Sequence, residues 1–309
     1  MRARLIAAVM ALEVLLAIGA VIRATTNSPA SPPATSRPAA PAAPVVAVVS
    51  PRGVVLPVVS REAGGWRVRT PCGGQTVLSS AKPLTTATVV LDPGHGGEDT
   101  GASGPNGLTE AELNLAVARQ AKAALERSGL SVVLTRDGPY NMNLETRAAI
   151  VMGLRPRAFV SVHHNSVGVV PSPRPGTEAY YQVASPESKR LGGLLYEEVV
   201  NALSPLGGPW VAARAGAKYM VGRDGDDYLG VLRRTHGVPA ALAEMAYITH
   251  ASEAQLLARP ETQRIEGEAI ARAVQRFLKT SDPGSGFIEA TPPPTNRGGG
   301  GLLCTDPQF

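Results

Sequence analysis

The chain has 309 residues, 44% of them hydrophobic and 18% charged, which is enough for one large core or two modest ones and excludes a wholly disordered protein. A polytopic membrane protein is also excluded, because only one apolar run approaches the length of a bilayer span. The formal charge of +5 lies within residues 1–61, which contain six Arg and one Glu. The remainder is neutral, which disfavours nucleic-acid binding.

The beginning of the chain has the pattern of an export signal. Arg2 and Arg4 precede the apolar run 5–22, as in a secretory signal peptide. As a helix, this run would span about 27 Å, which also suits a retained anchor, although Glu13 in its middle opposes a permanent span. We therefore expect residues 1–23 to be a cleaved signal or a membrane anchor, in preference to a buried cytosolic helix. The protein is expected to be exported to the periplasmic or cell-wall space.

The segments on either side of the main domain differ from it in composition. Residues 24–44 are rich in Pro and Ala and predict an extended linker. Residues 45–85 alternate short Val-rich runs with turn residues, which predicts a small β-rich extension of antiparallel strands. This extension is either an SH3-like appendage or a decoration packed on the main domain. Residues 281–309 are rich in Pro and Gly and predict a C-terminal tail.

Residues 86–280 alternate apolar strands with amphipathic helices. Strands are predicted at 86–92, 131–135, 158–163, 177–183 and within 239–248. Helices are predicted at 109–129, 144–154, 186–203 and 252–279, the last as one helix or two. Thr109 and Glu112 have the spacing of a capping box. Because most strands are apolar throughout, the pattern predicts an α/β domain with a mainly parallel, mixed and twisted sheet covered by helices on both faces.

Polar residues lie where such a sheet places its active site, at the carboxyl ends of its strands. His95 follows the first strand and His163 ends the third. Glu110 begins the first long helix, and Glu244 lies inside the last strand. Two His, one carboxylate ligand and a second free carboxylate would make a catalytic zinc site.

Each of these residues also has a structural alternative. His95 could be a turn residue, and Glu110 could complement the helix dipole. His163 is harder to explain in this way, because a polar residue that closes an apolar strand needs a partner. Glu244 is the strongest single candidate, since a carboxylate inside an apolar strand is costly to bury unless it is paired or functional.

The run LDPGHGGEDTGASGPNGLTEAELNLAVA resembles the opening of the zinc-dependent N-acetylmuramoyl-L-alanine amidases of the AmiC/CwlV-like class, called amidase type 3. VVLTRD, LETRAAI, FVSVHHNS, GTEAYY and PAALAEMAY follow in that family's order, so that the similarity covers about residues 87–280. The resemblance implies one zinc ion and hydrolysis of the amide between N-acetylmuramic acid and L-alanine of the stem peptide. Peptidoglycan or its muramyl-peptide fragments would be the substrate, in cell-wall remodelling or daughter-cell separation, and we expect a monomer.

The resemblance also assigns roles to individual residues. His95, Glu110 and His163 would bind zinc, and Glu244 would be the catalytic carboxylate. The family has a single His in its strand-end motif, whereas His163 is followed here by His164. Motif position favours His163, and alternation along a strand lets only one of the two face the site.

Four further residues are candidates for contacts near the site. Asn165, Arg214 and Arg223 are candidate substrate-binding residues, the two Arg as groups that would stabilise the oxyanion. For each Arg, the preferred alternative is a solvated surface position. The residues after Glu244 differ from the usual Thr-Gly-Phe, and His250 follows them as an extra polar residue, more readily a loop residue than a ligand.

The only two cysteines, Cys72 and Cys304, flank the main domain. Outside the cytoplasm such a pair can form a disulfide, and two free thiols are the alternative. A zinc site made from them is disfavoured, because neither has a second ligand at short spacing.

Two other functions remain open from the sequence. One is a zinc peptidase that cuts within the stem peptide, since the same metal site could do that chemistry. The other is a non-catalytic wall-binding module, which the intact set of site residues disfavours.

Overall fold

The computed structural model describes residues 43–168, 170–208, 215–290, 292–293 and 304–309. The predicted signal or anchor, residues 1–23, lies outside these ranges, as does most of the predicted linker 24–44. Within the described ranges, no helix has both the length and the apolar character needed to cross a bilayer.

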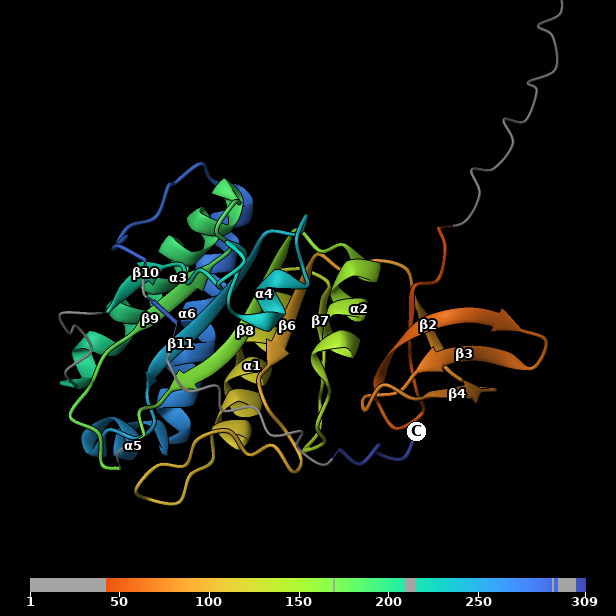
Figure 1. The fold of residues 1–309 in the computed structure, drawn as a ribbon, viewed down its shortest axis with the longest axis horizontal. Coiled ribbons are helices and arrows are strands. Elements are labelled where there is room, and N and C mark those ends of the chain that lie inside the picture. Colours follow the sequence, from red (N-terminus) through yellow and green to blue (C-terminus); the bar gives the residue numbers. More distant parts are fainter. Residues whose placement is uncertain (1–42, 169, 209–214, 291, 294–303) are drawn as a thin grey trace, which may run out of the picture. The chain divides into compact units, whose positions relative to one another are not determined.

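A six-stranded sheet forms the centre of the main domain (Figure 1). Its strands are β6 (Val89–Pro93), β7 (Val132–Leu134), β8 (Ala158–Asn165), β9 (Glu178–Tyr181), β10 (Gly216–Lys218) and β11 (Ala240–Tyr247). Their order is β10-β9-β11-β8-β6-β7. Neighbouring strands are parallel except for β11 and β9, which are antiparallel. The prediction of a mainly parallel, mixed sheet is therefore confirmed.

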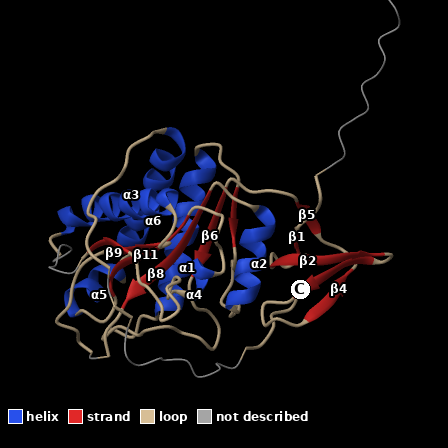
Figure 2. Ribbon diagram, turned by 45° about the horizontal axis from the view of Figure 1, so that its top comes forward, coloured by secondary structure: helices blue, strands red, loops and turns tan. Residues whose placement is uncertain are grey.

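Helices cover both faces of this sheet (Figure 2). One face carries α1 (Glu110–Arg127), α3 (Pro186–Leu203), the short 3₁₀ helix η1 (Ser204–Leu206), α5 (Ala251–Leu257) and α6 (Pro260–Lys279). The other face carries α2 (Leu144–Leu154) and α4 (Gly230–Arg233). The side-chain oxygen of Thr109 accepts a hydrogen bond from the Glu112 N–H, which confirms the capping box. Residues 252–279 form two helices, the second of which has Pro260 in its first turn.

The residues before the main domain form a second, antiparallel sheet. Its strands are β1 (Ala47–Val49), β2 (Val55–Glu62), β3 (Gly65–Arg69), β4 (Gln75–Leu78) and β5 (Lys82–Leu84), in the order β4-β3-β2-β1-β5. Val48, Leu56 and Val68 form a small core of its own. Ala47 and Val55 instead join the core beneath α2. The second sheet thus packs as a decoration on the main domain through α2.

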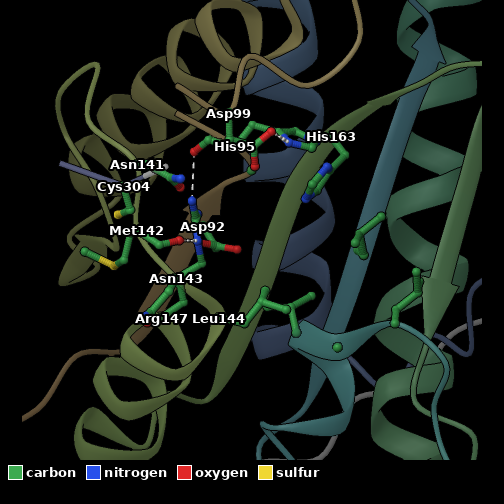
Figure 3. Close-up of a pocket in the computed structure, with 15 residues that line it drawn as sticks. Asp92, His95, Asp99, Asn141, Met142, Asn143, Leu144, Arg147, His163 and Cys304 are labelled. Carbon is green, nitrogen blue, oxygen red and sulfur yellow. Dashed lines mark hydrogen bonds and ion pairs between the residues drawn. The ribbon is translucent and has the colours of Figure 1, made fainter. Parts of the chain in front are cut away.

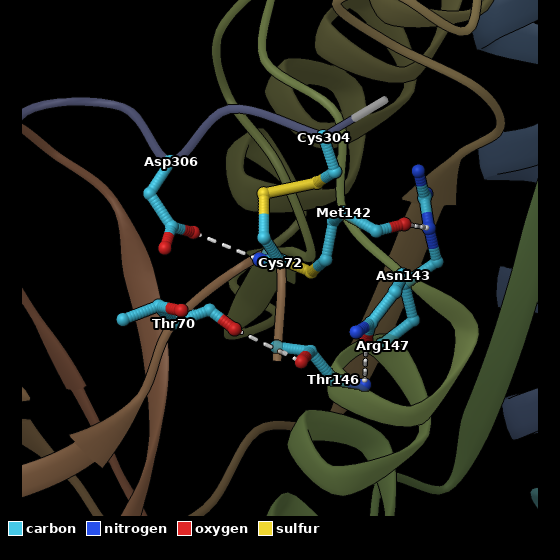
Figure 4. The surroundings of a disulfide bond; sticks show 8 residues. All are labelled: Thr70, Cys72, Met142, Asn143, Thr146, Arg147, Cys304 and Asp306. Atoms are coloured by element: carbon cyan, nitrogen blue, oxygen red, sulfur yellow. Dashed lines mark hydrogen bonds between the residues drawn. A yellow bond between two sulfur atoms is a disulfide. The ribbon is translucent and has the colours of Figure 1, made fainter. Parts of the chain in front are cut away.

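Two C-terminal segments also pack on the domain. Near β10, the Ala217 N–H donates to the Gly286 carbonyl at 2.8 Å, and the Ile288 N–H donates to the Ala217 carbonyl at 3.0 Å. Farther along the chain, Cys304 forms a disulfide with Cys72, and their Cα atoms lie 5.6 Å apart (Figure 4). Of the two alternatives left open for the cysteines, the structure therefore contains the disulfide.

Helices α1 and α6 pack so closely that Gly267 cannot carry a side chain without displacement. A Cβ at Gly267 would lie 2.7 Å from the Ala121 backbone nitrogen. We expect Gly267→Ala to lower the free energy of unfolding by about 1–3 kcal/mol, although alanine is the better helix former. Urea unfolding measures this change. As a control, Glu268→Ala removes only an exposed ion pair with Arg264 and should change the free energy by less than about 1 kcal/mol. Equal effects of the two variants would contradict the packing argument.

Candidate metal centre

Three candidate metal ligands meet at the carboxyl edge of the six-stranded sheet. His95 lies in the turn after β6, Glu110 is the first residue of α1, and His163 lies near the end of β8. The Glu110 Oε1 atom is 3.2 Å from His95 Nε2 and 3.0 Å from His163 Nδ1. The ligand atoms of all three residues lie within 4.8 Å of one another. The structure thus brings together the three residues that the sequence proposed as zinc ligands.

The turn that carries His95 approaches the other two ligands very closely. A Cβ at Gly94 would lie 2.1 Å from the His163 ring, and one at Gly101 would lie 2.6 Å from Glu110 Oε2. His95 itself has a φ of 61°, a left-handed conformation that is uncommon for residues other than glycine. The glycines of this turn therefore allow the backbone to reach the metal ligands.

Two buried arginines support the same turn from the protein interior. The Arg147 guanidinium donates to the Pro93 carbonyl at 2.8 Å. It also donates to the His95 carbonyl at 2.7 Å (Figure 3). Arg136, which is fully buried, donates to the carbonyls of Pro93 at 2.9 Å and Gly94 at 2.8 Å. The sequence analysis missed both arginines, although a charged residue directly after a predicted apolar strand, as at Arg136, was a usable signal.

Asp92 balances part of this positive charge. Its Oδ1 atom lies 2.6 Å from Arg147 Nη1 in an almost fully buried ion pair. Burial alone would raise the pKa of Asp92, but the Arg147 guanidinium and a hydrogen bond from Thr135 lower it below its usual value. The carboxylate therefore stays charged and keeps Arg147 in place beneath the turn.

Asp99 orients the His95 ring (Figure 3). Its Oδ1 atom lies 2.8 Å from His95 Nδ1, so that Nε2 is the nitrogen that faces Glu110. A carboxylate behind a metal-binding imidazole fixes its orientation and raises its basicity. Burial lowers the pKa of His95, but the hydrogen bonds to Asp99 and Glu110 outweigh it and raise the pKa to about 10. A metal ion would have to displace this proton.

Alternation along β8 separates the two adjacent histidines. His163 faces Glu110, whereas His164 is buried toward the helices, with Nδ1 2.8 Å from Asn114 Oδ1. His164 Nε2 lies 3.3 Å from Glu266 Oε1. His164 is thus enclosed by α1 and α6. It does not face the candidate site, which agrees with the choice of His163 as the candidate ligand. His250 forms the N-cap of α5, in keeping with a loop residue.

Glu244 lies in β11 between two polar neighbours. It is in register with His163 of β8 on one side and with Glu178 of β9 on the other. Its Oε2 atom is buried and has no hydrogen-bond partner among the described residues. Burial raises the pKa of Glu244 well above its usual value, and the negative charges of Glu110 and Glu178 raise it further. A carboxyl group in this environment is suited to accept and return a proton.

Glu178 is a further buried carboxylate that the sequence analysis did not select. It accepts hydrogen bonds from Tyr180 Oη at 2.7 Å and Asn165 Nδ2 at 2.8 Å, and it lies 2.8 Å from Lys218 Nζ. Glu178 lies in an apolar strand, and the same feature led to the selection of Glu244 from the sequence. The side-chain amide of Asn165, a candidate substrate-binding residue, is thus already occupied by Glu178.

The ligand cluster opens into a pocket of about 500 Å³ (Figure 3). His95 and His163 line one part of it, and Leu144 and Leu229 line another. Leu144 and Leu229 also border a neighbouring hollow, which we call the arginine hollow after its three arginines, Arg223, Arg233 and Arg234. Arg223 is exposed there, whereas the candidate Arg214 lies outside the described residues.

The donor atoms fit a catalytic zinc ion. Two imidazole nitrogens and one carboxylate oxygen are a common protein ligand set for such an ion, with a fourth position open to water or substrate. His95, Glu110 and His163 supply these donors, and the pocket supplies the open side. The Asp99 contact adds the carboxylate partner that such histidines usually have.

Comparison with known proteins matches this architecture to one family. A family model described as N-acetylmuramoyl-L-alanine amidase matches residues 89–276. The uncharacterized protein YqiI of Bacillus subtilis is 32% identical over 218 residues, which cover 69% of this chain and 97% of YqiI. N-acetylmuramoyl-L-alanine amidase AmiC of Neisseria meningitidis is 29% identical over 223 residues, which cover 62% of this chain and 53% of AmiC. The chain therefore spans about half the length of that relative.

A solved structure shares the fold. The catalytic domain of CwlV, an N-acetylmuramoyl-L-alanine amidase from Bacillus (Paenibacillus) polymyxa, aligns with a TM-score of 0.54 and 31% sequence identity. The alignment covers 62% of this chain and 98% of the CwlV domain. The likeness thus extends over nearly the whole of that domain.

Zinc binding is expected to release a proton from His95. Since the pKa of His95 in the metal-free protein is about 10, its ring is protonated at neutral pH and must lose that proton to bind zinc. The apparent affinity should therefore rise about tenfold per pH unit below that pKa. Calorimetric zinc titrations in buffers of different ionisation enthalpy measure the protons released. An affinity that does not change with pH would contradict the assignment of His95.

Proposed function

Because the chain belongs to the N-acetylmuramoyl-L-alanine amidase family, we propose that it is an exported peptidoglycan hydrolase that uses zinc. Its reaction is hydrolysis of the amide between the lactyl group of N-acetylmuramic acid and L-alanine of the stem peptide. The observation that carries the proposal is the convergence of His95, Glu110 and His163 beside the buried carboxylate of Glu244. This arrangement would place a metal ion beside a buried proton acceptor, next to the pocket that His95 and His163 line.

The proposed mechanism uses the three candidate zinc ligands and Glu244. A zinc ion held by the three ligands would supply an acidified water and polarise the amide carbonyl. Glu244 removes a proton from the attacking water and delivers a proton to the nitrogen of L-alanine as the C–N bond breaks. The products are a lactyl carboxylic acid and a peptide with a free amino terminus, which together account for the atoms of the amide and one water.

The surroundings of the cluster support this use of Glu244. Its unpartnered Oε2 atom is kept from bulk water, and burial raises its pKa, so that the carboxylate binds a proton more tightly than an exposed glutamate does. Glu178, which several donors hold in place, maintains a negative charge on its other side. Because both effects make Glu244 a stronger proton acceptor than an exposed glutamate, it suits a base that works on acidified water.

We further propose that the stem peptide extends from the pocket toward the arginine hollow. Leu144 and Leu229 line both the pocket and the hollow, which gives a continuous surface. The carboxylates of a stem peptide would meet Arg223 there. Arg233 already donates to the Asp227 carbonyl, and Arg234 forms an ion pair with Glu145. Arg223 is therefore the most available of the three guanidinium groups in the hollow.

Export would bring the catalytic domain to its substrate. In this proposal residues 1–23 direct the chain across the membrane or anchor it there. Residues 24–44 act as a tether, and the protein works as a monomer. The charge-neutral body is consistent with a substrate that is held by groove contacts more than by a long-range field. The proposed role is cell-wall remodelling or daughter-cell separation.

The Glu244→Gln variant is expected to lose catalysis and keep its metal. Glutamine has a similar shape but cannot accept the water proton, so kcat should fall by about 10²- to 10⁴-fold. Liquid chromatography of a soluble muramyl peptide measures turnover, and native mass spectrometry measures bound zinc. A chelator should abolish the activity of the wild-type chain. Glu126→Gln, on the exposed end of α1, is the matched control. Wild-type turnover by Glu244→Gln would remove the proposed base from the mechanism.

The Arg223→Gln variant tests the direction of the stem peptide. Loss of an exposed charge contact, worth up to about 1 kcal/mol, should raise KM about fivefold for a peptide with free carboxylates and leave kcat nearly unchanged. A peptide with amidated carboxylates should show a smaller effect. Arg52→Gln, at an exposed turn after β1, is the control. If both variants behave alike, the peptide does not lie over the arginine hollow.

A further inference from the structure

Cys304 brings the C-terminal end of the chain to the mouth of the metal-site pocket. It lines the pocket together with His95, His163 and Met142 (Figure 3). Its sulfur is bonded to Cys72, which follows β3 of the second sheet. A residue far outside the family match thus forms part of the wall of the candidate active site.

The segment Cys304–Phe309, which we call the C-terminal strap, has three further contacts. The Cys72 N–H donates to Asp306 Oδ1 at 2.8 Å (Figure 4). Thr305 lies close to the carboxylate of Glu98, in the same turn as His95, and lowers the pKa of Glu98. Phe309 packs against the small core of the second sheet. The strap is thus fixed both to the second sheet and to the turn that carries a metal ligand.

The residues just before Cys72 also bond to another wall of the pocket. The Asn143 N–H donates to the Pro71 carbonyl at 2.9 Å. Thr146 Oγ1 donates to the Thr70 carbonyl at 3.0 Å (Figure 4). Asn143 and its neighbours Met142 and Leu144 line the pocket. The residues around Cys72 therefore position both the strap and the segment that faces it.

The C-terminal part of the chain borders both hollows. Pro293 lines the arginine hollow, and Cys304 lines the pocket. These two residues therefore border the surface over which we propose that the stem peptide extends.

We propose that the C-terminal strap is a specificity-determining wall of the substrate groove, held in place by the Cys72–Cys304 disulfide. The strap would admit short muramyl peptides and restrict cross-linked polymeric peptidoglycan. This proposal rests on the proposed amidase function. The reason is steric: a soluble fragment needs one open pocket, whereas a cross-linked strand must enter a groove that is open along its length.

The disulfide is the covalent part of this arrangement. Without it the strap keeps the hydrogen bond at Asp306, the contact of Thr305 with Glu98 and the packing of Phe309. Hydrogen bonds of partly exposed groups contribute little net stability, so the strap would leave the groove for part of the time. Entry of the polymer would then depend on the fraction of molecules in which the strap is displaced.

The test compares two substrates in the full chain. The double variant Cys72→Ser, Cys304→Ser keeps the strap but loses its covalent attachment. The rates of cleavage of a soluble muramyl peptide and of cross-linked sacculi are measured for each protein. The ratio of the sacculus rate to the soluble rate should rise at least about threefold in the double variant. The zinc content should stay close to that of the wild-type chain, so that the ratio of the two rates reports access to the groove and not loss of the metal.

Two further experiments do not depend on how well the double variant folds. Tris(2-carboxyethyl)phosphine supplies the two electrons that, with two protons, convert the disulfide into two thiols, and it should raise the ratio of the wild-type chain only. Asp306→Ala, with the disulfide intact, should raise the ratio by a smaller factor. Asp137→Asn, which removes an exposed ion pair with Arg119, is the matched control and should leave the ratio unchanged.

The outcomes distinguish failure of the strap proposal from failure of the proposed amidase function. If both rates fall together, or if neither changes while zinc content is retained, the strap only stabilises the fold and the proposal is overturned. If the wild-type chain cleaves neither substrate, the amidase function fails and this proposal fails with it, for a different reason. A raised ratio in the double variant and in the reduced wild-type chain supports the wall.

Discussion

The buried ion pair between Arg147 and Asp92 is the interaction on which the site depends. Two charges in the interior are costly unless each is also hydrogen-bonded, and here both are. Asp92 accepts from Thr135 and Ser161, while Arg147 donates to the carbonyls of Pro93 and His95. The pair therefore satisfies the backbone of a turn that holds a histidine in a left-handed conformation. The protein interior thus supports the position of His95 beside Glu110 and His163.

The parallel register of the sheet supplies the rest of the site. Strands β6, β8 and β11 end at the same edge, so residues distant in sequence become neighbours. His163 and Glu244 are cross-strand partners, and the pairing of β8 and β11 shifts just after Glu244. Glu178 enters from the antiparallel strand β9. The result is a candidate metal-ligand set with a separate buried carboxylate beside it, which is the arrangement that metal-assisted hydrolysis of an amide would require.

Much of this could be predicted from the sequence, and the exceptions have physical reasons. The bounds of α2 and α3 followed from helical spacing, and the start of α1 followed from Thr109. The strand β10 and the helix α4 were not predicted, because three or four residues carry too little periodicity to be recognised. The engagement of Asn165 by Glu178 is a tertiary contact between strands, which local patterns do not show. The place of Cys304 in the pocket could not be foreseen either, since it depends on a disulfide that spans 232 residues.

The central claim, that water cleaves the bond between the lactyl carbonyl and L-alanine, is tested most directly by isotope labelling. A soluble muramyl peptide is hydrolysed by the full chain in water enriched in ¹⁸O, and the products are resolved by mass spectrometry. The account predicts one ¹⁸O atom in the new carboxyl group of the muramic acid and an unlabelled, intact peptide that begins with L-alanine. Label in a carboxyl group of a shortened peptide would contradict the account and identify a peptidase.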